Sequence, residues 1–369
     1  MQLSETSRSP SEASSSILRT LLWLCEISSP TGGEKELCDR VVERLRAASL
    51  PESIRRYGDS IVVPITRGSR GPKIALVGHL DVVNTSHDGP PRLDGDRVYG
   101  PGASDMKSGL ALMLDLAEHD RGVCGGVDLT LVFYAREEGP YLDNELGLVL
   151  EQDRELRAVD LAVCMEPSDN KLSLGASGSI HAAATFEGKT SHSARPWQGE
   201  NAIHKAGTFL SELGRLAPRD VVIDGLAYRT VTSATMAQGG RGRNVVPDAF
   251  TLNLNHRFAP GVSLDEAKHD VTNLVGNRAR IEWKDLSPSA LPFAKHPLVV
   301  LLSKAGVVGI EPKQAWTDVA RFSTLGIPAV NFGPGENAQA HQRNEWTSLS
   351  KLVDGQRIIQ RWFGNLSKG

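Results

Sequence analysis

Residues 72–83 read PKIALVGHLDVV, and this stretch decides the fold. Its apolar run at 74–77 is typical of a strand that is buried on both faces of a parallel sheet. Gly78 ends the run, and His79 and Asp81 follow it. Residues two apart in an extended chain point the same way, so this imidazole and this carboxylate leave the strand side by side. Because ligands of open α/β sheets bind at the carboxyl ends of strands, the sequence predicts a functional site here.

We interpret His79 as a metal ligand and Asp81 as the carboxylate that fixes the tautomer of that imidazole. An isolated HxD triplet is more often part of a solvated loop. The interpretation therefore depends on residues elsewhere in the chain.

Strands and helices alternate on both sides of this stretch. We predict further buried strands at 127–135 and 159–165, with helices at 104–117 and 142–152 between and around them. This order predicts a doubly wound α/β domain built on a mixed sheet. The same pattern continues in the helices predicted at 17–27, 35–48, 297–307, 319–324 and 348–363, and in the strands predicted at 53–57, 61–66 and 329–332. We expect residues 84–102 to form a loop.

The pattern changes after GASGS at 175–179. Alternating strands at 180–186, 231–237, 250–258 and 279–286 enclose two helices, in the order βαββαβ of a ferredoxin-like α+β domain. We therefore predict that a lid and dimerisation domain at 179–288 interrupts a catalytic domain formed by 16–178 and 289–369. Residues 1–15 are rich in Ser and Glu and are predicted to be a disordered tail.

Bulk composition excludes several classes of protein. The 369 residues carry a net charge of −3, so there is no basic field for nucleic acid. No apolar run approaches the length of a membrane span, and no signal peptide is recognisable. The four cysteines show no CxxC spacing, and three lie in apolar or amphipathic runs, where we expect them to be reduced and buried. These features favour a cytoplasmic protein that acts on a small molecule.

Further polar residues stand at or just beyond predicted strand ends. They are the pair Glu137 and Glu138, then Glu166 and His341, while Asp105 opens a helix after the long loop. Nitrogen and oxygen ligands without thiolate suit Zn²⁺, with Mn²⁺ or Co²⁺ possible. Three carboxylates around one divalent ion would leave surplus buried negative charge, so we predict two metals with Asp105 shared between them.

Two adjacent residues in the extended chain that follows a strand point to opposite sides, so they cannot both bind one metal. We therefore assign Glu138 as the ligand and Glu137 as the general base. Taken singly, each of these residues is more often a surface or turn residue, and only their joint appearance at strand ends favours a metal site. A nucleotide-binding protein is disfavoured because no GxGxxG or P-loop follows a strand. A serine hydrolase is disfavoured because GASGS is not GxSxG.

These residues resemble the zinc-dependent aminoacylase and carboxypeptidase family of di-zinc metallopeptidases. The similar strings are GHLDVV at 78–83, GASDMKSG at 102–109, REEG at 136–139, MEP at 165–167, SHSARP at 191–196 and GPGENAQAHQ at 333–342. Since all the functional positions of the family are filled, a relative that has kept only a binding or scaffolding role is disfavoured.

The resemblance implies a set of roles. One zinc would be held by His79, Asp105 and Glu166, and the other by Asp105, Glu138 and His341. A cis peptide bond is implied between Asp105 and Met106. The 179–288 domain would form a homodimer, in which His192 reaches the active site of the partner and supports the oxyanion. The positions linked to substrate carboxylates are Arg195, Asn244, Arg257 and Thr317.

The strings GGRGRNVVPD at 239–248, NLNHRFAP at 253–260 and TDVARF at 317–322 narrow the expected activity. Within the family they are similar to members that hydrolyse N-succinyl-LL-2,6-diaminopimelate. Deacetylation of N-acetylornithine and hydrolysis of dipeptides stay open as alternatives. Some members carry an Arg pair just before the lid, whereas this chain has Ala176 and Ser177. The succinyl carboxylate then needs another cation, for which Arg195 is the candidate.

Overall fold

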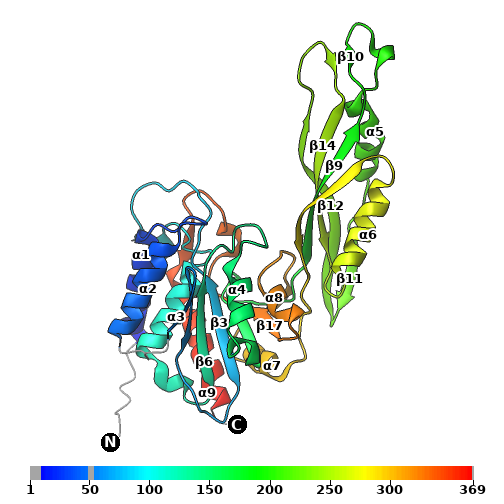
Figure 1. Ribbon diagram of the computed structural model, residues 1–369. Coiled ribbons are helices and arrows are strands. Elements are labelled where there is room, and N and C mark those ends of the chain that lie inside the picture. Colours follow the sequence, from blue (N-terminus) through cyan, green and yellow to red (C-terminus); the bar gives the residue numbers. More distant parts are fainter. Residues whose placement is uncertain (1–9, 49–53, 368–369) are drawn as a thin grey trace, which may run out of the picture. The chain divides into compact units, whose positions relative to one another are not determined.

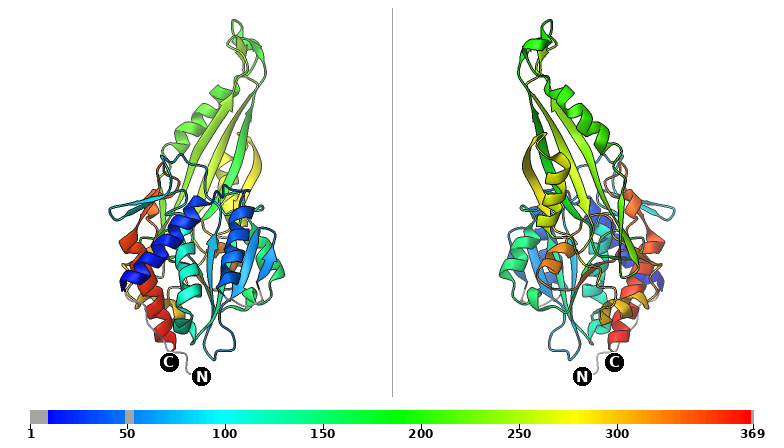
Figure 2. Two further views of the ribbon diagram at one scale, coloured as in Figure 1. Left: turned by 90° about the vertical axis from the view of Figure 1, so that its left-hand side faces the viewer. Right: turned by 90° about the vertical axis from the view of Figure 1, so that its right-hand side faces the viewer.

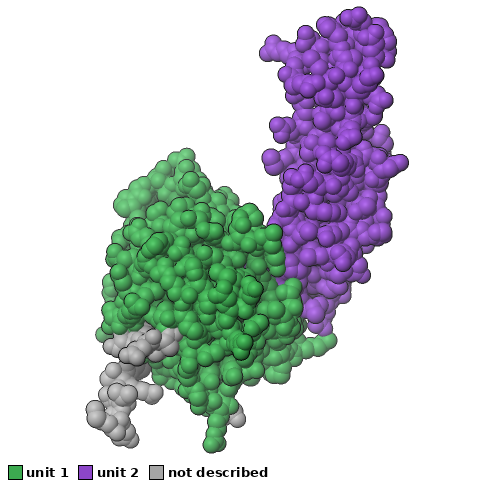
Figure 3. Space-filling model, viewed as in Figure 1, with its two compact units in different colours: residues 1–174, 293–311, 321–369 green, residues 175–292, 312–320 purple. Residues whose placement is uncertain are grey.

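The computed structural model describes residues 10–48 and 54–367. The chain forms two compact units, coloured separately in Figure 3. Unit 1 comprises Met1–Leu174, Phe293–Glu311 and Arg321–Gly369, and unit 2 comprises Gly175–Pro292 and Pro312–Ala320. The boundaries that we predicted for the lid, 179–288, stay a prediction.

An eight-stranded mixed sheet forms the centre of unit 1, in the order β1-β2-β6-β3-β7-β17-β8-β16. Strand β3 is parallel to both β6 and β7, and β17 is parallel to β7. Every residue of β3 after Lys73 is buried, as expected for a strand covered on both faces. The strands of this sheet are β1 (Arg55–Tyr57), β2 (Ser60–Pro64), β3 (Lys73–His79), β6 (Asp128–Tyr134), β7 (Leu161–Cys164), β8 (Leu172–Leu174), β16 (Ile310–Pro312) and β17 (Ala329–Asn331).

Helices cover both faces of this sheet. Helices α1 and α3 lie on one side of β3 and β6, and α4 lies on the other, as Figures 1 and 2 show. This arrangement confirms the doubly wound mixed sheet. The helices within this unit are α1 (Pro10–Glu26), α2 (Lys35–Ala47), α3 (Lys107–His119), α4 (Glu145–Gln152), α7 (Pro297–Ser303) and α9 (Leu349–Leu366). Helix α8 (Val319–Thr324) begins in the last two residues of the second segment of unit 2 and continues into unit 1.

Unit 2 contains a five-stranded antiparallel sheet in the order β11-β12-β14-β9-β15. Its strands are β9 (Gly178–Glu187), β11 (Arg219–Ile223), β12 (Leu226–Gly239), β14 (Ala249–Phe258) and β15 (Arg280–Ser287), with helices α5 (Ala202–Leu213) and α6 (Leu264–Val275). Without the edge strand β11, this is the ferredoxin-like arrangement that the sequence predicts. Helix α6 begins with a capping box, in which Ser263 and Glu266 cap it reciprocally.

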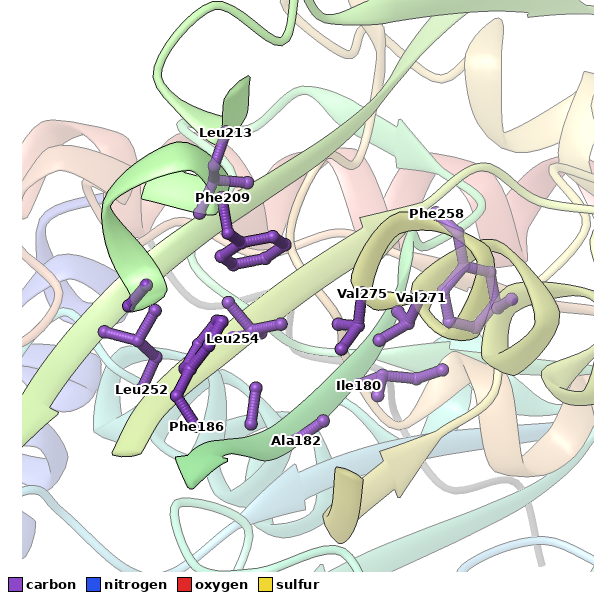
Figure 4. Packing of buried hydrophobic residues seen from close by; sticks show 13 residues of the cluster. Ile180, Ala182, Phe186, Phe209, Leu213, Leu252, Leu254, Phe258, Val271 and Val275 are labelled. Atoms are coloured by element: carbon purple, nitrogen blue, oxygen red, sulfur yellow. The ribbon is translucent and has the colours of Figure 1, made fainter. Parts of the chain in front are cut away.

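One apolar cluster holds unit 2 together. Alternate residues of β9 and β14 point to the same face of the sheet, where α5 and α6 cover them. The rings of Phe186 and Phe209 lie 5.6 Å apart between centroids, in the group of side chains that Figure 4 shows. The period-two burial therefore leaves the opposite face of these strands polar.

Three sequence-based predictions need correction. Pro10–Ser15 were predicted to belong to a disordered tail, but they form the first turns of α1, with Glu12 favourably placed near its N-terminus; residues 1–9 lie outside the described residues. The predicted loop at 84–102 contains a hairpin, β4 (Arg92–Asp94) and β5 (Arg97–Tyr99), which pairs with β18 (Trp346–Ser348). Edge strand β11 was missed although Asp224 and Gly225, both at positive φ, supply a hairpin turn.

All four cysteines are free and buried, which includes the three for which the sequence predicts this state. Within residues 10–48 and 54–367, no helix combines the length and the apolar character that crossing a lipid bilayer requires.

Candidate metal centre

The neighbouring parallel strands β6, β3 and β7 bring the predicted ligands to one edge of the sheet. His79 is the last residue of β3 and lies opposite Tyr134, the last residue of β6. Glu137 and Glu138 follow Tyr134, and Glu166 follows the end of β7. The register of these parallel strands thus places their carboxyl ends, and the side chains beyond them, together.

Two groups of potential ligands share Asp105. His79, Asp105 and Glu166 form one group, and Asp105, Glu138 and His341 form the other, with ligand atoms within 4.8 Å of one another in each. Oδ1 of Asp105 lies 3.4 Å from Nε2 of His79, whereas its Oδ2 lies 3.5 Å from Nε2 of His341. One carboxylate therefore faces both groups, one oxygen to each, as a shared ligand must.

The chemistry of these groups fits divalent metal ions. Asp105 and Glu166 are buried, and Asp81 behind them is fully buried, so several carboxylates lie close together with little contact with water. Such crowding is unfavourable without a cation. Nε2 of His79 is buried and has no hydrogen bond within the described residues, which leaves its lone pair for a ligand bond. The donor set contains nitrogen and oxygen only, as predicted for Zn²⁺ and similar ions.

Both imidazoles have a raised pKa in this metal-free arrangement. A hydrogen bond with Glu138 raises the pKa of His341 to about 9, although partial burial opposes this. Burial also disfavours the charged form of His79, but Asp105 and Asp81 together raise the pKa of that imidazole well above its usual value. The carboxylates thus favour a cation at these two positions, which is the role that a metal ion would fill.

Asp81 supports the site from behind. Its Oδ1 and Oδ2 accept hydrogen bonds of 3.0 Å from the backbone N–H groups of Glu137 and Glu138. Nδ1 of His79 lies 2.9 Å from the backbone oxygen of Asp81 and 3.5 Å from its Oδ1. Although burial opposes the charge of Asp81, its contacts with His79 and these two N–H groups lower its pKa. The tautomer of His79 is therefore set mainly by the backbone of Asp81, with the carboxylate as the more distant partner.

Two backbone features mark the loops of the site. The Asp105–Met106 peptide bond is cis, as the family resemblance implies. Arg136 and His341, both non-glycine residues, have φ values of 64° and 61°. Residues held in this sparsely populated region are concentrated at functional sites.

Glu137 lies beside the ligands without belonging to either group that contains Asp105. Its carboxylate lies within 4.8 Å of ligand atoms of His79 and Glu138. It is half-buried and stands at the edge of the site. A carboxylate in this position can exchange a proton with a water molecule or a substrate that reaches the ligands.

The remaining predicted residues belong to unit 2. His192, Arg195 and Asn244 come together in a short ribbon, where β10 (Ser191–His192) pairs with β13 (Val245–Val246). The backbone N–H of Ser193 donates to the carbonyl of Asn244 at 2.9 Å, and that of Arg195 donates to the carbonyl of His192 at 2.8 Å. All three predicted side chains therefore lie on one small, exposed structure.

Arg257 and Thr317 lie elsewhere in unit 2. Arg257 is in the middle sheet strand β14, on the polar face opposite the helices, and its Nε donates to Oδ1 of Asn255 at 3.0 Å. Thr317 is buried, just before α8. Ala176 and Ser177, which replace the Arg pair of some relatives, are fully buried.

Sequence analysis missed three buried carboxylates in the loops of the site, which are Glu34, Glu336 and Glu345. Glu34 accepts hydrogen bonds from the N–H groups of Gly32 and Arg136, and Glu336 from that of Ser348. Burial raises the pKa of Glu345 to about 7, although backbone N–H groups donate to it. Glu34 and Glu345 follow no predicted strand, so the strand-end signal could not find them. Glu336 lies four residues after the strand predicted at 329–332, within the string at 333–342, and was not singled out.

Comparison with known proteins identifies the family. Residues 75–365 match Peptidase family M20/M25/M40. The chain belongs to this family. The chain is also 37% identical over 342 residues to the DapE protein of Mycobacterium tuberculosis, covering 92% of this chain and 96% of that protein. It is 36% identical over 346 residues to succinyl-diaminopimelate desuccinylase of Corynebacterium glutamicum, covering 92% of this chain and 94% of that enzyme.

Solved structures of M20 proteins share the fold. A tripeptidase from Staphylococcus aureus superposes with a TM-score of 0.79 at 21% identity, covering 96% of this chain and 99% of that one. A dinuclear metal binding peptidase of family M20 from Bacillus subtilis gives a TM-score of 0.71 at 16% identity, covering 97% and 99%. The family resemblance, the fold class and the prediction of an amide-hydrolysing enzyme are confirmed.

Proposed function

We propose that this chain hydrolyses N-succinyl-LL-2,6-diaminopimelate to succinate and LL-2,6-diaminopimelate, a step of lysine and diaminopimelate biosynthesis. The observation that carries the hydrolytic chemistry is the position of Asp105, whose two oxygens face two separate imidazoles at 3.4 and 3.5 Å. The choice of substrate is supported by the succinyl-diaminopimelate desuccinylase of Corynebacterium glutamicum, to which this chain is 36% identical over 94% of that enzyme.

We infer that the resident cofactors are two Zn²⁺ ions per chain, for which Co²⁺ or Mn²⁺ could substitute. His79, Asp105 and Glu166 would hold one ion, and Asp105, Glu138 and His341 the other. When bound, such ions polarise the amide carbonyl and lower the pKa of the attacking water. The carboxylate of Asp81 holds the backbone N–H groups of both Glu138, the proposed ligand, and Glu137, the proposed base.

Proton transfer is assigned to Glu137. Its carboxylate takes a proton from the water that attacks the amide carbon. It then donates that proton to the amine nitrogen as the C–N bond breaks, so Glu137 ends the reaction as a carboxylate again. A single carboxylate can serve both steps because it lies beside the ligands and is not assigned to a metal. Without it, hydroxide would have to come from solution.

His192 is proposed to stabilise the oxyanion. Its Nδ1 accepts a hydrogen bond of 3.1 Å from the backbone N–H of Ala194, so the neutral imidazole carries its proton on Nε2. That N–H is exposed and is free to donate to a developing negative charge. We infer that it acts in the active site of the partner chain in a homodimer.

A substrate with three carboxylates requires cations in a protein of net charge −3. The guanidinium of Arg257 is held in place for this role. Oδ1 of Asn255 accepts a hydrogen bond from Nε of Arg257, and Nδ2 of Asn255 lies 2.8 Å from Nε2 of His181. This leaves the two terminal nitrogens of Arg257 for a bidentate carboxylate. Arg195 is the candidate for the succinyl carboxylate, and Asn244 and Thr317 are proposed as further substrate contacts.

The homodimer is proposed to form through the 179–288 domain. Strand β11 pairs with residues 226–230 of β12, and within the described residues no strand covers the same edge of β12 beyond them. Met236 on this stretch is 71% exposed. An uncovered strand edge with an exposed apolar residue favours pairing with a second copy. Sedimentation should give twice the chain mass, and Met236→Arg should reduce it toward that of a monomer.

A substrate panel tests the proposed activity. The Zn²⁺-loaded protein should show a kcat/KM for N-succinyl-LL-2,6-diaminopimelate at least about 100-fold above that for N-acetylornithine or for dipeptides. A higher kcat/KM for either competitor would identify the alternative deacetylase or dipeptidase function instead. We further propose that the reaction takes place in the cytoplasm, where cell fractionation should find the activity.

A further inference from the structure

We propose that Glu345, which is not a metal ligand in either group, is a positioning residue that sets metal affinity by holding the backbone of Asp105. This inference rests on the proposed function in one respect, which is the role of Asp105 as the ligand shared by two metals. It concerns metal binding, and it therefore does not depend on which amide is the substrate.

The carboxylate of Glu345 accepts several backbone hydrogen bonds from one loop. Its Oε1 accepts hydrogen bonds from the N–H groups of Ser104 and Asp105, each at 2.7 Å, and its Oε2 accepts one from Gly102 at 3.0 Å. The backbone oxygen of Glu345 also accepts from the N–H of Gly100 at 3.1 Å. A single residue thus binds four N–H groups of the segment that leads to Asp105.

Only a carboxylate can make this set of contacts. Its two oxygens provide acceptor sites for three converging donors, and hydrogen bonds to a charged acceptor are stronger than those between neutral groups. Glu345 is 3% exposed, so water does not substitute for a lost contact. A glutamine would keep one oxygen and would turn its NH₂ group, a donor, toward a backbone donor.

A buried cation accompanies this carboxylate. Lys107 is fully buried, two residues after Asp105, and its Nζ donates to the backbone oxygen of Ile27 at 3.0 Å. Its positive charge interacts with Glu345 and offsets part of the unfavourable burial of the negative charge. Both ends of the Asp105 segment are therefore anchored by charged side chains inside the protein.

The loop itself has little room to adjust elsewhere. Gly102 has a φ of 70°, and a Cβ at this position would lie 2.3 Å from Cγ1 of Val82. The segment therefore packs directly against the chain that follows β3. With the backbone held on this side by packing and on the other by Glu345, the side chain of Asp105 is directed toward both His79 and His341.

The chain offers a matched control for the test. Glu336 is also buried, and its carboxylate accepts hydrogen bonds from Oγ1 of Thr347 at 2.7 Å and from the N–H of Ser348 at 3.0 Å. That carboxylate has no hydrogen bond to residues 100–105 in the described structure. Both Glu336→Gln and Glu345→Gln therefore alter a carboxylate that is less than 10% exposed, and we expect only the second to loosen the backbone of Asp105.

The experiment measures metal affinity of the apo protein by competition with a chelator, together with the visible spectrum of the Co²⁺-loaded form and thermal unfolding without metal. Glu345→Gln should weaken metal binding about 10–100-fold and change the Co²⁺ spectrum. Glu336→Gln should leave affinity and spectrum unchanged, although both variants lower the melting temperature of the apo protein.

Glu345→Asp provides a second variant if Glu345→Gln does not fold. It keeps the charge but is one methylene too short to reach all three N–H groups, so metal affinity should again fall. Wild-type affinity in either folded variant, or an equal loss in Glu336→Gln, would overturn the proposal. Absence of desuccinylase activity in the wild-type protein would instead contradict only the proposed substrate.

Discussion

The carboxylate of Asp81 accepts a 3.0 Å hydrogen bond from the backbone N–H of Glu138. Asp81 follows strand β3 and Glu138 follows strand β6, so this contact joins the two neighbouring strand ends that carry His79 and the Glu pair. A second bond from the N–H of Glu137 fixes both residues of the pair at once. We therefore expect the proposed roles of Glu138 as a ligand and Glu137 as a base to depend on Asp81, which needs to contact neither the metal nor the substrate.

Replacement of Asp81 tests this dependence. Asp81→Asn has only one oxygen for two N–H donors, and we expect kcat/KM and metal affinity to fall about 10–100-fold. Thr31→Val is the control, because it removes only the 3.1 Å hydrogen bond that Oγ1 of Thr31 donates to Asp81. Kinetics and chelator competition should show a small effect in the control. Equal effects in both variants would contradict the assignment.

Glu137 and Glu138 are adjacent but should respond differently to the same change. Glu137→Gln should retain two metal ions per chain and lower kcat by a factor of about 100 or more, because only proton transfer is lost. Glu138→Gln should lose metal, because a ligand is altered. Metal analysis beside steady-state kinetics separates the two. Near-normal turnover of Glu137→Gln would remove its assignment as the base.

Removal of metal should abolish activity reversibly. Dialysis against a chelator should give an inactive protein whose activity returns as two equivalents of Zn²⁺ are added, because Asp105 faces two groups. His341→Ala should bind one equivalent tightly, since the group of His79, Asp105 and Glu166 is left intact. A wild-type stoichiometry of one would contradict the shared position of Asp105.

Arg257→Ala should raise KM for the succinylated substrate with little change in metal content, because this half-buried guanidinium is proposed to pair with a substrate carboxylate. We expect an increase of about 10-fold or more. Arg229→Ala is a suitable control, since Arg229 is an exposed arginine of the neighbouring strand β12 whose Nε pairs with Asp220 at 3.0 Å. An unchanged KM in Arg257→Ala would show that Arg257 has only a structural role.

Asp153 should make the stability of unit 1 depend on pH. Burial raises the pKa of Asp153, but Nε of Arg55 at 2.7 Å, the N–H of Leu156 and the hydroxyl of Tyr57 lower it more, and the net shift is downward. A group with a lowered folded pKa stabilises the protein above its unfolded pKa of about 3.9 and loses that contribution as the pH falls through the folded value.

Asp153→Asn should therefore lower the free energy of unfolding by about 1–3 kcal/mol at pH 7, with a difference from wild type that shrinks below pH 4. Glu155→Gln is the matched control, since Glu155 contacts the same Arg55 at 2.9 Å but is 60% exposed. Such a surface pair contributes about 0–1 kcal/mol. Urea unfolding at several pH values measures both variants, and a pH-independent difference for Asp153→Asn would contradict the linkage.

The candidate metal ligands could be predicted from strand ends because this signal depends on local properties. The apolar runs at 74–77 and 161–164 are long enough to indicate buried strands, and in each case a polar side chain, His79 or Glu166, stands two residues after the run. The hairpin of β4 and β5 was missed, because its strands are only three residues each and β4 is exposed. Its partner β18 lies about 250 positions further along, a pairing that no local pattern reports.

The sequence by itself determined the alternation of strands and helices, the family and the choice of candidate ligand side chains, because periodicity and motif spacing are properties of neighbouring residues. Only the tertiary structure decided which oxygen of Asp105 faces which imidazole, and that Glu345 and Asp81 hold the loops behind the site. These contacts join residues from 26 positions apart, as for His79 and Asp105, to 243 positions apart, and their geometry follows from the packing of the whole unit.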